Sequence, residues 1–321
     1  LPNRNCIGLF GYAGGVIKNT SVIDVDIRGN SRTGGLTGNG FGTITNCYSK
    51  GSVTGYKSVG GLVGYGSNYT VSNCYAAGNV TGASPVGGLV GDAKDSEISN
   101  CYATGNVEGS SPVGGLVGNG NDSKILNCYA TMNVKGEYYV YGLVGNCTST
   151  TIISYWNTNM QGQAVGSMPS TNSKLTGLTT DEMKSPAFVG MLNDHININW
   201  AAWKYAANNE NGGYPILDYG RGTPNPDIFW LANAQQPTIV GNTYEIRTAE
   251  QLAWIAKETN SGNNNFSGKT VKLINNIDLQ GKVWTPIGSN YPDLYKGIFE
   301  GNNKKIQNLK IGEISYHSLF Q

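Results

Sequence analysis

Charge, histidine and long apolar runs are all scarce in this sequence of 321 residues. Only 13% of the residues are charged, and the formal net charge is +1. A nearly neutral chain offers no large basic surface to a phosphate backbone, so we expect no nucleic-acid partner. No apolar run is long enough to cross a bilayer, and residues 1–15 lack the basic and hydrophobic regions of a signal peptide. We therefore expect no membrane insertion, and we place any targeting signal outside this sequence.

Motifs for catalysis and metal binding are missing as well. The cysteines never form a C-x-x-C pair, and the two histidines, His195 and His317, are too few for a typical zinc site. No Ser-His-Asp or Cys-His arrangement is recognisable in the sequence. We therefore predict a protein that is not an enzyme and that has no catalytic residues, no cofactor and no metal.

Glycine, in contrast, is abundant and recurs in a fixed pattern. The 46 glycines disfavour long helices and suit tight turns between short strands. Many belong to the motif Gly-Leu-x-Gly, which returns every 27 residues, and once after 26. The leucines of this motif are Leu9, Leu36, Leu62, Leu89, Leu116 and Leu143.

Other residue types follow the same period. One column holds asparagine at Asn46, Asn73, Asn100 and Asn127, and the next holds cysteine at Cys47, Cys74, Cys101 and Cys128. Such fixed spacing means that one structural unit stacks on copies of itself, and the alternating strings between glycines favour short strands. We predict an all-β fold, namely a β-solenoid (β-helix) of about six coils of 27 residues, with short capping helices.

Stacking places each side chain over its counterpart one coil away, at a strand spacing of about 4.8 Å. Leucine columns should then fill the interior, and asparagine columns should pass side-chain hydrogen bonds along the axis. We expect the cysteine column to be a buried ladder of thiols, although neighbouring coils also bring two sulfurs near disulfide distance. Charged columns alternate in sign, because Glu97 lies one period before Lys124 and Glu108 one period before Lys135.

Beyond the repeats the chain changes character, and we divide it into four parts. The predicted parts are the solenoid (1–160), a cap with one short helix (161–220), a linker rich in Pro, Gly and Asn (221–243), and a module of one helix and β-coils (244–321). The cap helix is predicted from a capping box formed by Thr179 and Glu182.

We expect this cap to cover the open apolar end of the solenoid, as terminal units of repeat proteins do. Its aromatic residues could instead form a platform that binds sugars. These residues are Trp200, Trp203, Tyr205 and Tyr214.

Three groups of residues carry a resemblance to a known family. They are the Gly-Leu-x-Gly repeats, the string "TTDEMKS" followed by "GGYPIL", and the string "TAEQLAWIAK" that leads to "WTPIG". The sequence resembles bacterial GLUG-motif repeat proteins, which are adhesin-like β-solenoids of the cell surface. The resemblance implies a secreted or cell-surface bacterial protein. Similar repeats accompany immunoglobulin A-cleaving metalloproteases, but the H-E-x-x-H helix of those enzymes is missing here.

The order of segments departs from that family. The "TAEQLAWIAK" segment normally opens a solenoid, whereas here it follows the repeats, and the chain stops at "SLFQ" where a Gly-Leu-Phe-Gly coil would belong. We expect residues 244–321 to pack against the first coil, at residues 7–28. This contact could form within one molecule or between neighbours, and we slightly favour head-to-tail assembly between copies because it would suit a surface fibre.

These features predict a non-enzymatic extracellular protein that presents a rigid solenoid surface for adhesion or cell-surface assembly. Its expected partners are other copies of the chain and host or bacterial surface glycans or proteins. The alternative is a carbohydrate-binding or carbohydrate-cleaving β-helix. Its possible ligand face would consist of Tyr138, Tyr139, Tyr141 and Trp156, whose rings could stack on sugars.

One acidic column is a candidate for a cation or catalytic site. Asn68, Asp95 and Asp122 lie one period apart and would bring two carboxylates about 5 Å from each other. Such a pair could hold Ca²⁺ or act in catalysis. Each residue follows Gly-Leu-Val-Gly in a predicted turn, where Asn and Asp are favoured for local backbone bonding, and we therefore predict a structural role.

Overall fold

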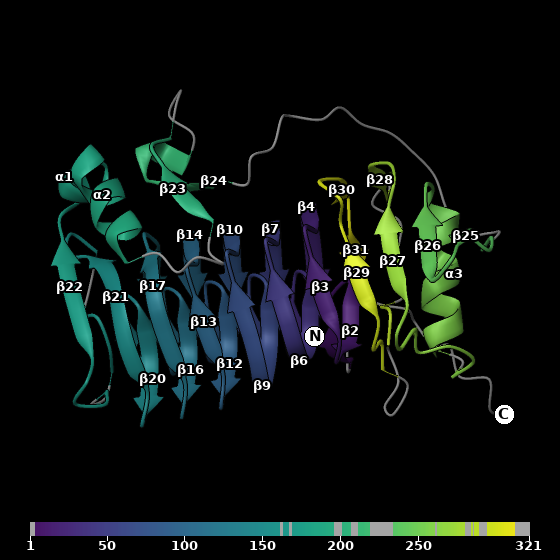
Figure 1. The fold of residues 1–321 in the computed structure, drawn as a ribbon. Helices are drawn as coiled ribbons and strands as arrows, with labels where there is room; N and C mark the ends of the chain where they lie inside the picture. The colour runs from purple at the N-terminus through teal and green to yellow at the C-terminus, as the bar shows by residue number, and fades with distance from the viewer. Residues whose placement is uncertain are drawn as a thin grey trace, which may run out of the picture.

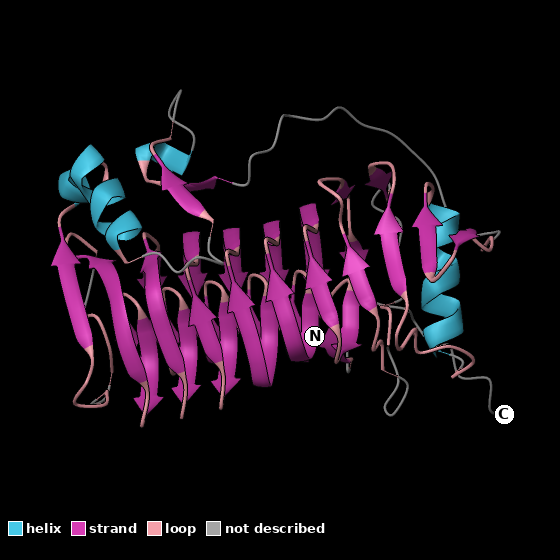
Figure 2. Cartoon of the chain, in the orientation of Figure 1, coloured by secondary structure: helices cyan, strands magenta, loops and turns pink. Residues whose placement is uncertain are grey.

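The computed structural model describes residues 4–160, 163–166, 169–195, 201–206, 211–218, 234–260, 262–279, 284, 286–288 and 294–311. Most strands of these residues form one elongated β-solenoid of about ten turns (Figure 1). Among the described residues, helices occur in the cap and in the C-terminal module (Figure 2). The predicted all-β solenoid is confirmed, with more turns than the repeats alone suggest.

Each coil of the repeat region adds strands to two parallel sheets. The six-stranded sheet consists of β1 (Asn5–Ile7), β5 (Ser31–Gly34), β8 (Lys57–Gly60), β11 (Ser84–Gly87), β15 (Val113–Gly114) and β19 (Val140–Tyr141). The larger sheet takes from the same region β2 (Phe10–Ala13), β3 (Val16–Lys18), β4 (Ser21–Arg28), β6 (Thr37–Thr45), β7 (Tyr48–Thr54), β9 (Val63–Ser72), β10 (Tyr75–Thr81), β12 (Val90–Lys94), β13 (Glu97–Ser99), β14 (Tyr102–Glu108), β16 (Val117–Asn121), β17 (Lys124–Ala130), β18 (Asn133–Lys135), β20 (Val144–Thr148), β21 (Thr151–Asn157) and β22 (Lys174–Leu178). Strands pair with their counterparts one period away, as Tyr75 with Tyr102 and Val80 with Val107.

The leucine column fills the interior of the solenoid, as predicted. Leu36, Leu62, Leu89, Leu116 and Leu143 are all fully buried. The backbone N–H of Leu36 donates to the carbonyl oxygen of Leu62, and the N–H of Leu62 donates to that of Leu89, both at 3.0 Å. Burial of one leucine side chain contributes about 1.5–3 kcal/mol. The column therefore favours stacking in this register over any other.

Glycine is required where neighbouring coils approach most closely. Gly78 and Gly105 have φ angles of +149° and +129°, which residues with a Cβ rarely adopt. A Cβ on Gly105 would also lie 2.2 Å from the carbonyl oxygen of Gly78 in the adjacent coil. The contact between backbones thus explains part of the high glycine content.

The single 26-residue spacing has a local explanation in β6 and β9. These strands pair as Gly40 with Gly66 and then as Gly42 with Tyr69, with a register shift between the two pairs. Phe41 alone lies between the two paired glycines of β6, whereas two residues lie between Gly66 and Tyr69 of β9. Further register shifts occur between β4 and β7 and between β17 and β21, and the core columns stay aligned across them.

The cap consists of two short helices and a two-stranded sheet. Its elements are α1 (Thr180–Met183), α2 (Pro186–Asp194), β23 (Ala202–Lys204) and β24 (Ile216–Asp218). The capping box of Thr179 and Glu182 is confirmed at the start of α1. The single expected helix is two helices, because the Ser185 hydroxyl accepts from the backbone N–H of Phe188 and starts a second helix with Pro186 in its first turn.

The cap lies along the side of the solenoid, so the expectation that it would cover the open end is wrong (Figure 1). It covers a column of stacked tyrosines, Tyr48, Tyr75, Tyr102 and Tyr129, whose successive ring centroids are 4.5, 4.6 and 5.2 Å apart. The rings of Trp203 and Phe188 pack on Tyr129 at 5.5 and 5.7 Å. Stacked and tilted rings attract beyond simple burial, and this column therefore holds the cap in place.

The aromatic residues of the cap do not form a shared platform for sugars. Trp203 and Tyr214 are buried in the contact with the tyrosine column, whereas Tyr205 is exposed. Trp200 lies outside the described residues.

The C-terminal module adds further turns to the same solenoid. Its elements are β25 (Thr238–Val240), β26 (Thr243–Ile246), α3 (Ala249–Asn260), β27 (Thr270–Leu273), β28 (Ile277–Asp278), β29 (Ile298–Glu300), β30 (Lys305–Gln307) and β31 (Lys310–Ile311). β25 pairs with β26, so the last part of the expected linker belongs to the module, and residues 221–233 lie outside the described residues. The apolar side of α3, which includes Leu252 and Ile255, is buried in the main core.

This module docks on the first coil of its own chain. β29 pairs in parallel with β3, and β30 and β31 pair with β4. The strands therefore follow one another in space as β26, β27, β29, β3 and β6, and the module extends the solenoid beyond the first coil (Figure 1). Its turns account for most of the difference from the six coils expected.

Large side chains fill the junction between module and first coil. The indole Nε1 of Trp284 donates to the carbonyl oxygen of Leu9 at 3.2 Å. The ring of Phe10 contacts those of Tyr295 and Phe299, with centroids 5.5 and 5.2 Å apart. All these residues are fully buried. Of the two arrangements considered from the sequence, the structure contains the intramolecular one; "SLFQ", residues 318–321, lies outside the described residues.

The charged columns have the predicted register, with Glu97 opposite Lys124 and Glu108 opposite Lys135. We expect Lys124→Glu to place like charges one coil apart and to lower the melting temperature by about 1–2 °C, more at low salt because ions screen the repulsion. Thermal unfolding at two salt concentrations measures this effect. The control is Lys174→Glu, which makes the same charge change opposite Ile153. An equal loss in both variants would contradict the register argument.

Candidate functional site

The cysteine column lies in the solenoid core. Cys47, Cys74, Cys101 and Cys128 are fully buried and free. The backbone N–H of each of the first three points to the sulfur one coil away at 3.4 Å, and each sulfur lies near the carbonyl oxygen two residues before it. Burial raises the pKa of the Cys101 thiol well above its ordinary value. These side chains therefore act as unreactive core residues rather than as a reactive site.

The asparagine column forms the predicted ladder of amide hydrogen bonds. Asn127 Nδ2 donates to Asn100 Oδ1 at 2.9 Å, and Asn100 Nδ2 donates to Asn73 Oδ1 at 2.8 Å. Asn46 Nδ2 donates to Asn19 Oδ1 at 3.1 Å. All five residues have φ between +51° and +53°. Asparagine tolerates this left-handed conformation better than most residues, which explains why the column holds this residue type.

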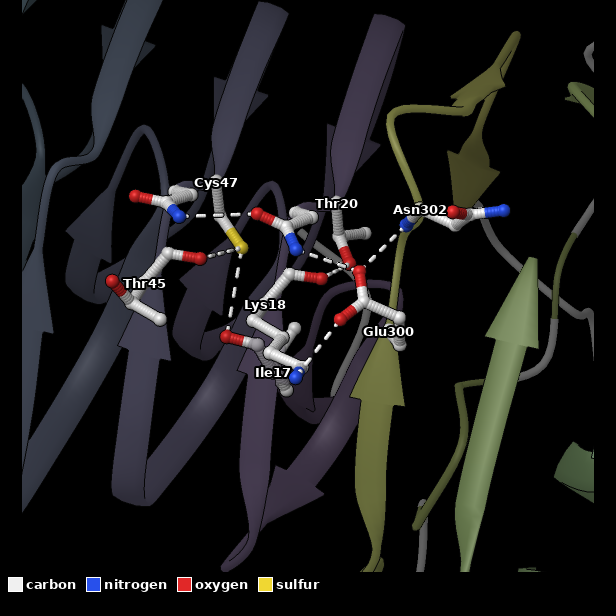
Figure 3. Close-up of polar contacts among 9 residues, drawn as sticks. Ile17, Lys18, Thr20, Thr45, Cys47, Glu300 and Asn302 are labelled. Atoms are coloured by element: carbon white, nitrogen blue, oxygen red, sulfur yellow. Dashed lines mark hydrogen bonds and ion pairs between the residues drawn. The ribbon is translucent and has the colours of Figure 1, made fainter. Parts of the chain in front are cut away.

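The ladder ends on a carboxylate of the docked module (Figure 3). Glu300 Oε1 accepts from Asn19 Nδ2 at 2.7 Å and from the backbone N–H of Asn302 at 2.8 Å. Glu300 Oε2 lies 3.0 Å from Lys18 Nζ, and the Glu300 side chain is only 15% exposed. Burial alone would raise the pKa of Glu300, but these donors and the Lys18 charge outweigh it and lower the pKa. The contact therefore needs an ionised Glu300.

A second amide ladder also ends on a carboxylate. Asn146 Nδ2 donates to Asn119 Oδ1 at 2.8 Å, and Asn119 Nδ2 donates to Asp92 Oδ1 at 2.9 Å. Burial raises the pKa of Asp92, and the bond from Asn119 and the charges of Lys57 and Arg32 oppose this rise only in part. Both ladders direct their donors towards an acidic residue, so a carboxylate closes each row of amides.

The four aromatic residues predicted as a ligand face differ in exposure. Tyr138 and Tyr139 are 67% and 61% exposed, and they line a shallow depression together with Lys135 and Glu137. These two tyrosines are therefore accessible to a ligand.

Tyr141 and Trp156 are instead half-buried beside the last turn. A Cβ on Gly166 would lie 2.3 Å from the Tyr141 ring, and one on Gly177 of β22 would lie 3.1 Å from Trp156 Nε1. Trp156 also packs against the main core. These two rings contribute to packing, and Tyr138 and Tyr139 are the exposed pair of the predicted face.

Sequence reasoning missed Tyr56, which is 59% exposed and lies on the same edge of the solenoid. This edge carries the turns that lead into the six-stranded sheet, and we call it the outer edge. It comprises Tyr56, Lys57, Ala83, Ser84, Ser110, Ser111, Glu137, Tyr138 and Tyr139. The signal for Tyr56 was present, because a large ring stands in a turn column that otherwise holds Asn30, Ala83, Ser110 and Glu137.

The acidic column has a local explanation. Asn68, Asp95 and Asp122 have φ of +52°, +48° and +49°, which suits Asn and Asp in tight turns. The carboxylate of Asp95 pairs with Lys94 at 3.8 Å. Within the described part of the chain, no group of three or more His, Cys, Asp or Glu side chains could hold a metal ion.

Comparison with known proteins adds information on the repeats. The family described as the GLUG motif matches residues 29–54, 55–81, 82–108 and 109–135, which are four successive coils. These matches confirm the resemblance for the repeat region. The curated proteins contain no match to the sequence. Among the described residues, no helix is long and apolar enough to span a membrane.

One solved structure is similar, a candidate immunoglobulin A1 protease from Bacteroides ovatus. The two chains are 23% identical, with a TM-score of 0.42, and the match covers 67% of this chain and 64% of that one. The aligned region therefore spans less than two thirds of the other protein. A TM-score of this size is too low to support an inference about this chain.

We expect the six cysteines, all buried, to react with a thiol reagent only after unfolding, because reaction requires access to the thiolate. Titration of native and denatured protein measures the number of reactive groups. Reaction of ladder thiols in the native protein, or a mass that shows disulfides between them, would contradict the buried thiol ladder.

The Glu300 contact predicts a pH dependence. The folded pKa is lowered, so its stabilising effect is complete above the ordinary glutamate pKa of about 4.3 and is lost as the pH falls through the lower folded value. We expect Glu300→Gln to weaken docking at neutral pH by about 1 kcal/mol and to flatten the stability curve below pH 4.3. Denaturant unfolding from pH 3 to 7 tests this. An unchanged slope in the variant would show that Glu300 does not carry the effect.

Proposed function

Because four successive GLUG motif repeats build the middle of this solenoid, we propose that the protein is a rigid, non-enzymatic scaffold that presents its outer surface for adhesion or cell-surface assembly. The observation that supports this role most is the unbroken strand pairing from the C-terminal module through the repeats to β22. Such a stack holds every surface side chain at a fixed height along the axis.

The proposed location is the exterior of a bacterial cell, either secreted or bound to the surface. The resemblance to adhesin-like GLUG proteins supports it. The interior also suits a rigid scaffold. Its buried side chains are mostly Leu, Val, Ile and Ala, and the amides of each ladder form hydrogen bonds with one another.

Head-to-tail assembly fits the same proposal. The contact between module and first coil has the geometry of any other coil–coil contact, so the module of one copy can replace that of another. Within one chain the first coil is already covered, and exchange therefore requires the module to dissociate first. The loss of the Glu300 charge at low pH would favour that step.

A second candidate function is carbohydrate binding, and the exposure of Tyr138 and Tyr139 supports it. Exposed aromatic rings on a rigid surface commonly stack on the apolar faces of sugars. A screen against a glycan array, run with a reducing-sugar assay, separates binding from cleavage. We expect no release of reducing ends, and their release would contradict the non-enzymatic proposal.

Assembly has its own test. We expect concentrated protein held at pH 3 and returned to neutral pH to form exchanged oligomers, whereas dilute protein returns as monomer, because exchange competes with intramolecular docking. Light scattering after size exclusion measures the mass. Monomer alone after concentrated refolding would contradict head-to-tail assembly while leaving the scaffold role intact.

A further inference from the structure

We propose that the outer edge is a binding track for a linear neutral oligosaccharide, which lies along the solenoid axis between Tyr56 at one end and Tyr138 with Tyr139 at the other. This inference rests on the carbohydrate-binding candidate above and specifies its site, its ligand and the direction of the ligand. Three of the four exposed tyrosines of the described chain, all but Tyr205, lie on this edge. The exposed tyrosines are therefore concentrated on one edge of the solenoid.

The edge has the shape of a shallow saddle. Between the tyrosines the same positions hold the compact residues Ala83, Ser84 and Pro85 in one coil and Ser110, Ser111 and Pro112 in the next. Tyr56 and Glu137 stand three coils apart in one column, a distance of about 14 Å at the usual strand spacing. Large rings therefore stand at both ends of a low stretch that can admit a chain of a few sugar rings.

Backbone hydrogen bonds hold the edge rigid. The N–H of Ala83 donates to the carbonyl oxygen of Tyr56 at 2.9 Å, and the N–H of Ser110 donates to that of Ala83 at 2.9 Å. The N–H groups of Glu137 and Tyr138 both donate to the carbonyl oxygen of Ser110, at 3.1 and 3.0 Å. The turns cannot move independently, so a ligand meets a preformed surface and loses little affinity to protein ordering.

A polar strip runs beside the saddle and supplies hydrogen bonds. It is a ladder of exposed amides, in which Asn106 Nδ2 donates to Asn79 Oδ1 at 3.0 Å and Asn133 Nδ2 donates to Asn106 Oδ1 at 3.5 Å. These three residues line a groove together with Glu108 and Lys135. Each amide has a further N–H and a further lone pair, and planar amides of this kind suit the neighbouring hydroxyls of a sugar.

The charges along the edge point to a neutral ligand. On the edge Lys57 is balanced by Glu137, and in the groove of the polar strip Lys135 is balanced by Glu108. Glu108 and Lys135 also stand opposite each other in register. An acidic or basic polymer would meet as much repulsion as attraction, whereas a neutral glycan has no charge to be rejected.

The test uses the full-length chain and a set of linear neutral hexasaccharides of gluco-, xylo-, manno- and chito-type, with an acidic hexagalacturonate as comparison. We expect at least one neutral hexasaccharide to bind, and Tyr56→Ala and Tyr138→Ala each to lower its affinity by at least about tenfold. The matching disaccharide is too short to reach both ends. Its weaker binding should therefore respond to only one of the two substitutions.

The control is Tyr205→Ala, which removes an exposed ring of the cap away from the edge and should leave the affinity unchanged. Isothermal titration calorimetry measures all variants, and circular dichroism checks their folding. Preference for the acidic hexamer, no binding by any neutral hexamer, or an equal loss in the Tyr205 variant would each overturn the track. If binding occurs but depends on neither Tyr56 nor Tyr138, the carbohydrate function stands and the proposed site fails.

Discussion

In-register parallel pairing between successive coils is the interaction on which the rest of this structure depends. A coil cannot bury its leucine, bond its backbone or satisfy its asparagine without an identical neighbour one period away. The pairing aligns Tyr75 with Tyr102 and buries Leu62 and Leu89 one above the other. It also explains the residue choices, because asparagine tolerates the left-handed turn and glycine permits the close approach of Gly78 to Gly105.

A stack of this kind must still deal with its ends, since an uncovered end is an unpaired strand edge and an exposed core. At the first coil the solution is the C-terminal module, which adds β29, β30 and β31 and then covers the outermost turn with α3. The amide ladder meets the same problem, because its last donor needs an acceptor. Glu300 supplies a charged one, and Lys18 balances that charge. Packing and electrostatics therefore both mark this junction as a true continuation of the solenoid.

The repeat columns could be predicted from the sequence because their period leaves only one register. Leu36, Asn100 and Cys101 lie where the spacing places them. The docking of the module could not be decided, because contacts within and between chains satisfy the same sequence equally well. The position of the cap was missed for a different reason. An amphipathic helix shows which side it buries but not what covers it. The tyrosines that Trp203 and Phe188 contact show no sequence signal beyond that of ordinary strand residues.

Surface features show the same division between periodic and local information. Trp156 is half-buried because β22, which lies beyond the regular repeats, packs beside it, whereas Tyr56 is exposed on the same edge as Tyr138. The contact on Trp156 comes from a segment without a period, and the surface around Tyr56 is built by several coils together. Exposure at a given column depends on what the non-repeating segments cover, and no spacing rule supplies that.

The most direct measurement of the central claim is to cut the chain between the repeats and the module. A protease site placed between residues 221 and 233 allows cleavage of the folded protein, and size exclusion with mass analysis then shows whether the two pieces remain together. Continuous strand pairing across the junction predicts a stable one-to-one complex at neutral pH, even in dilute solution, with an elution volume like that of the intact chain. Separation of the two folded pieces under these conditions would contradict the claim that the module completes the solenoid at the first coil.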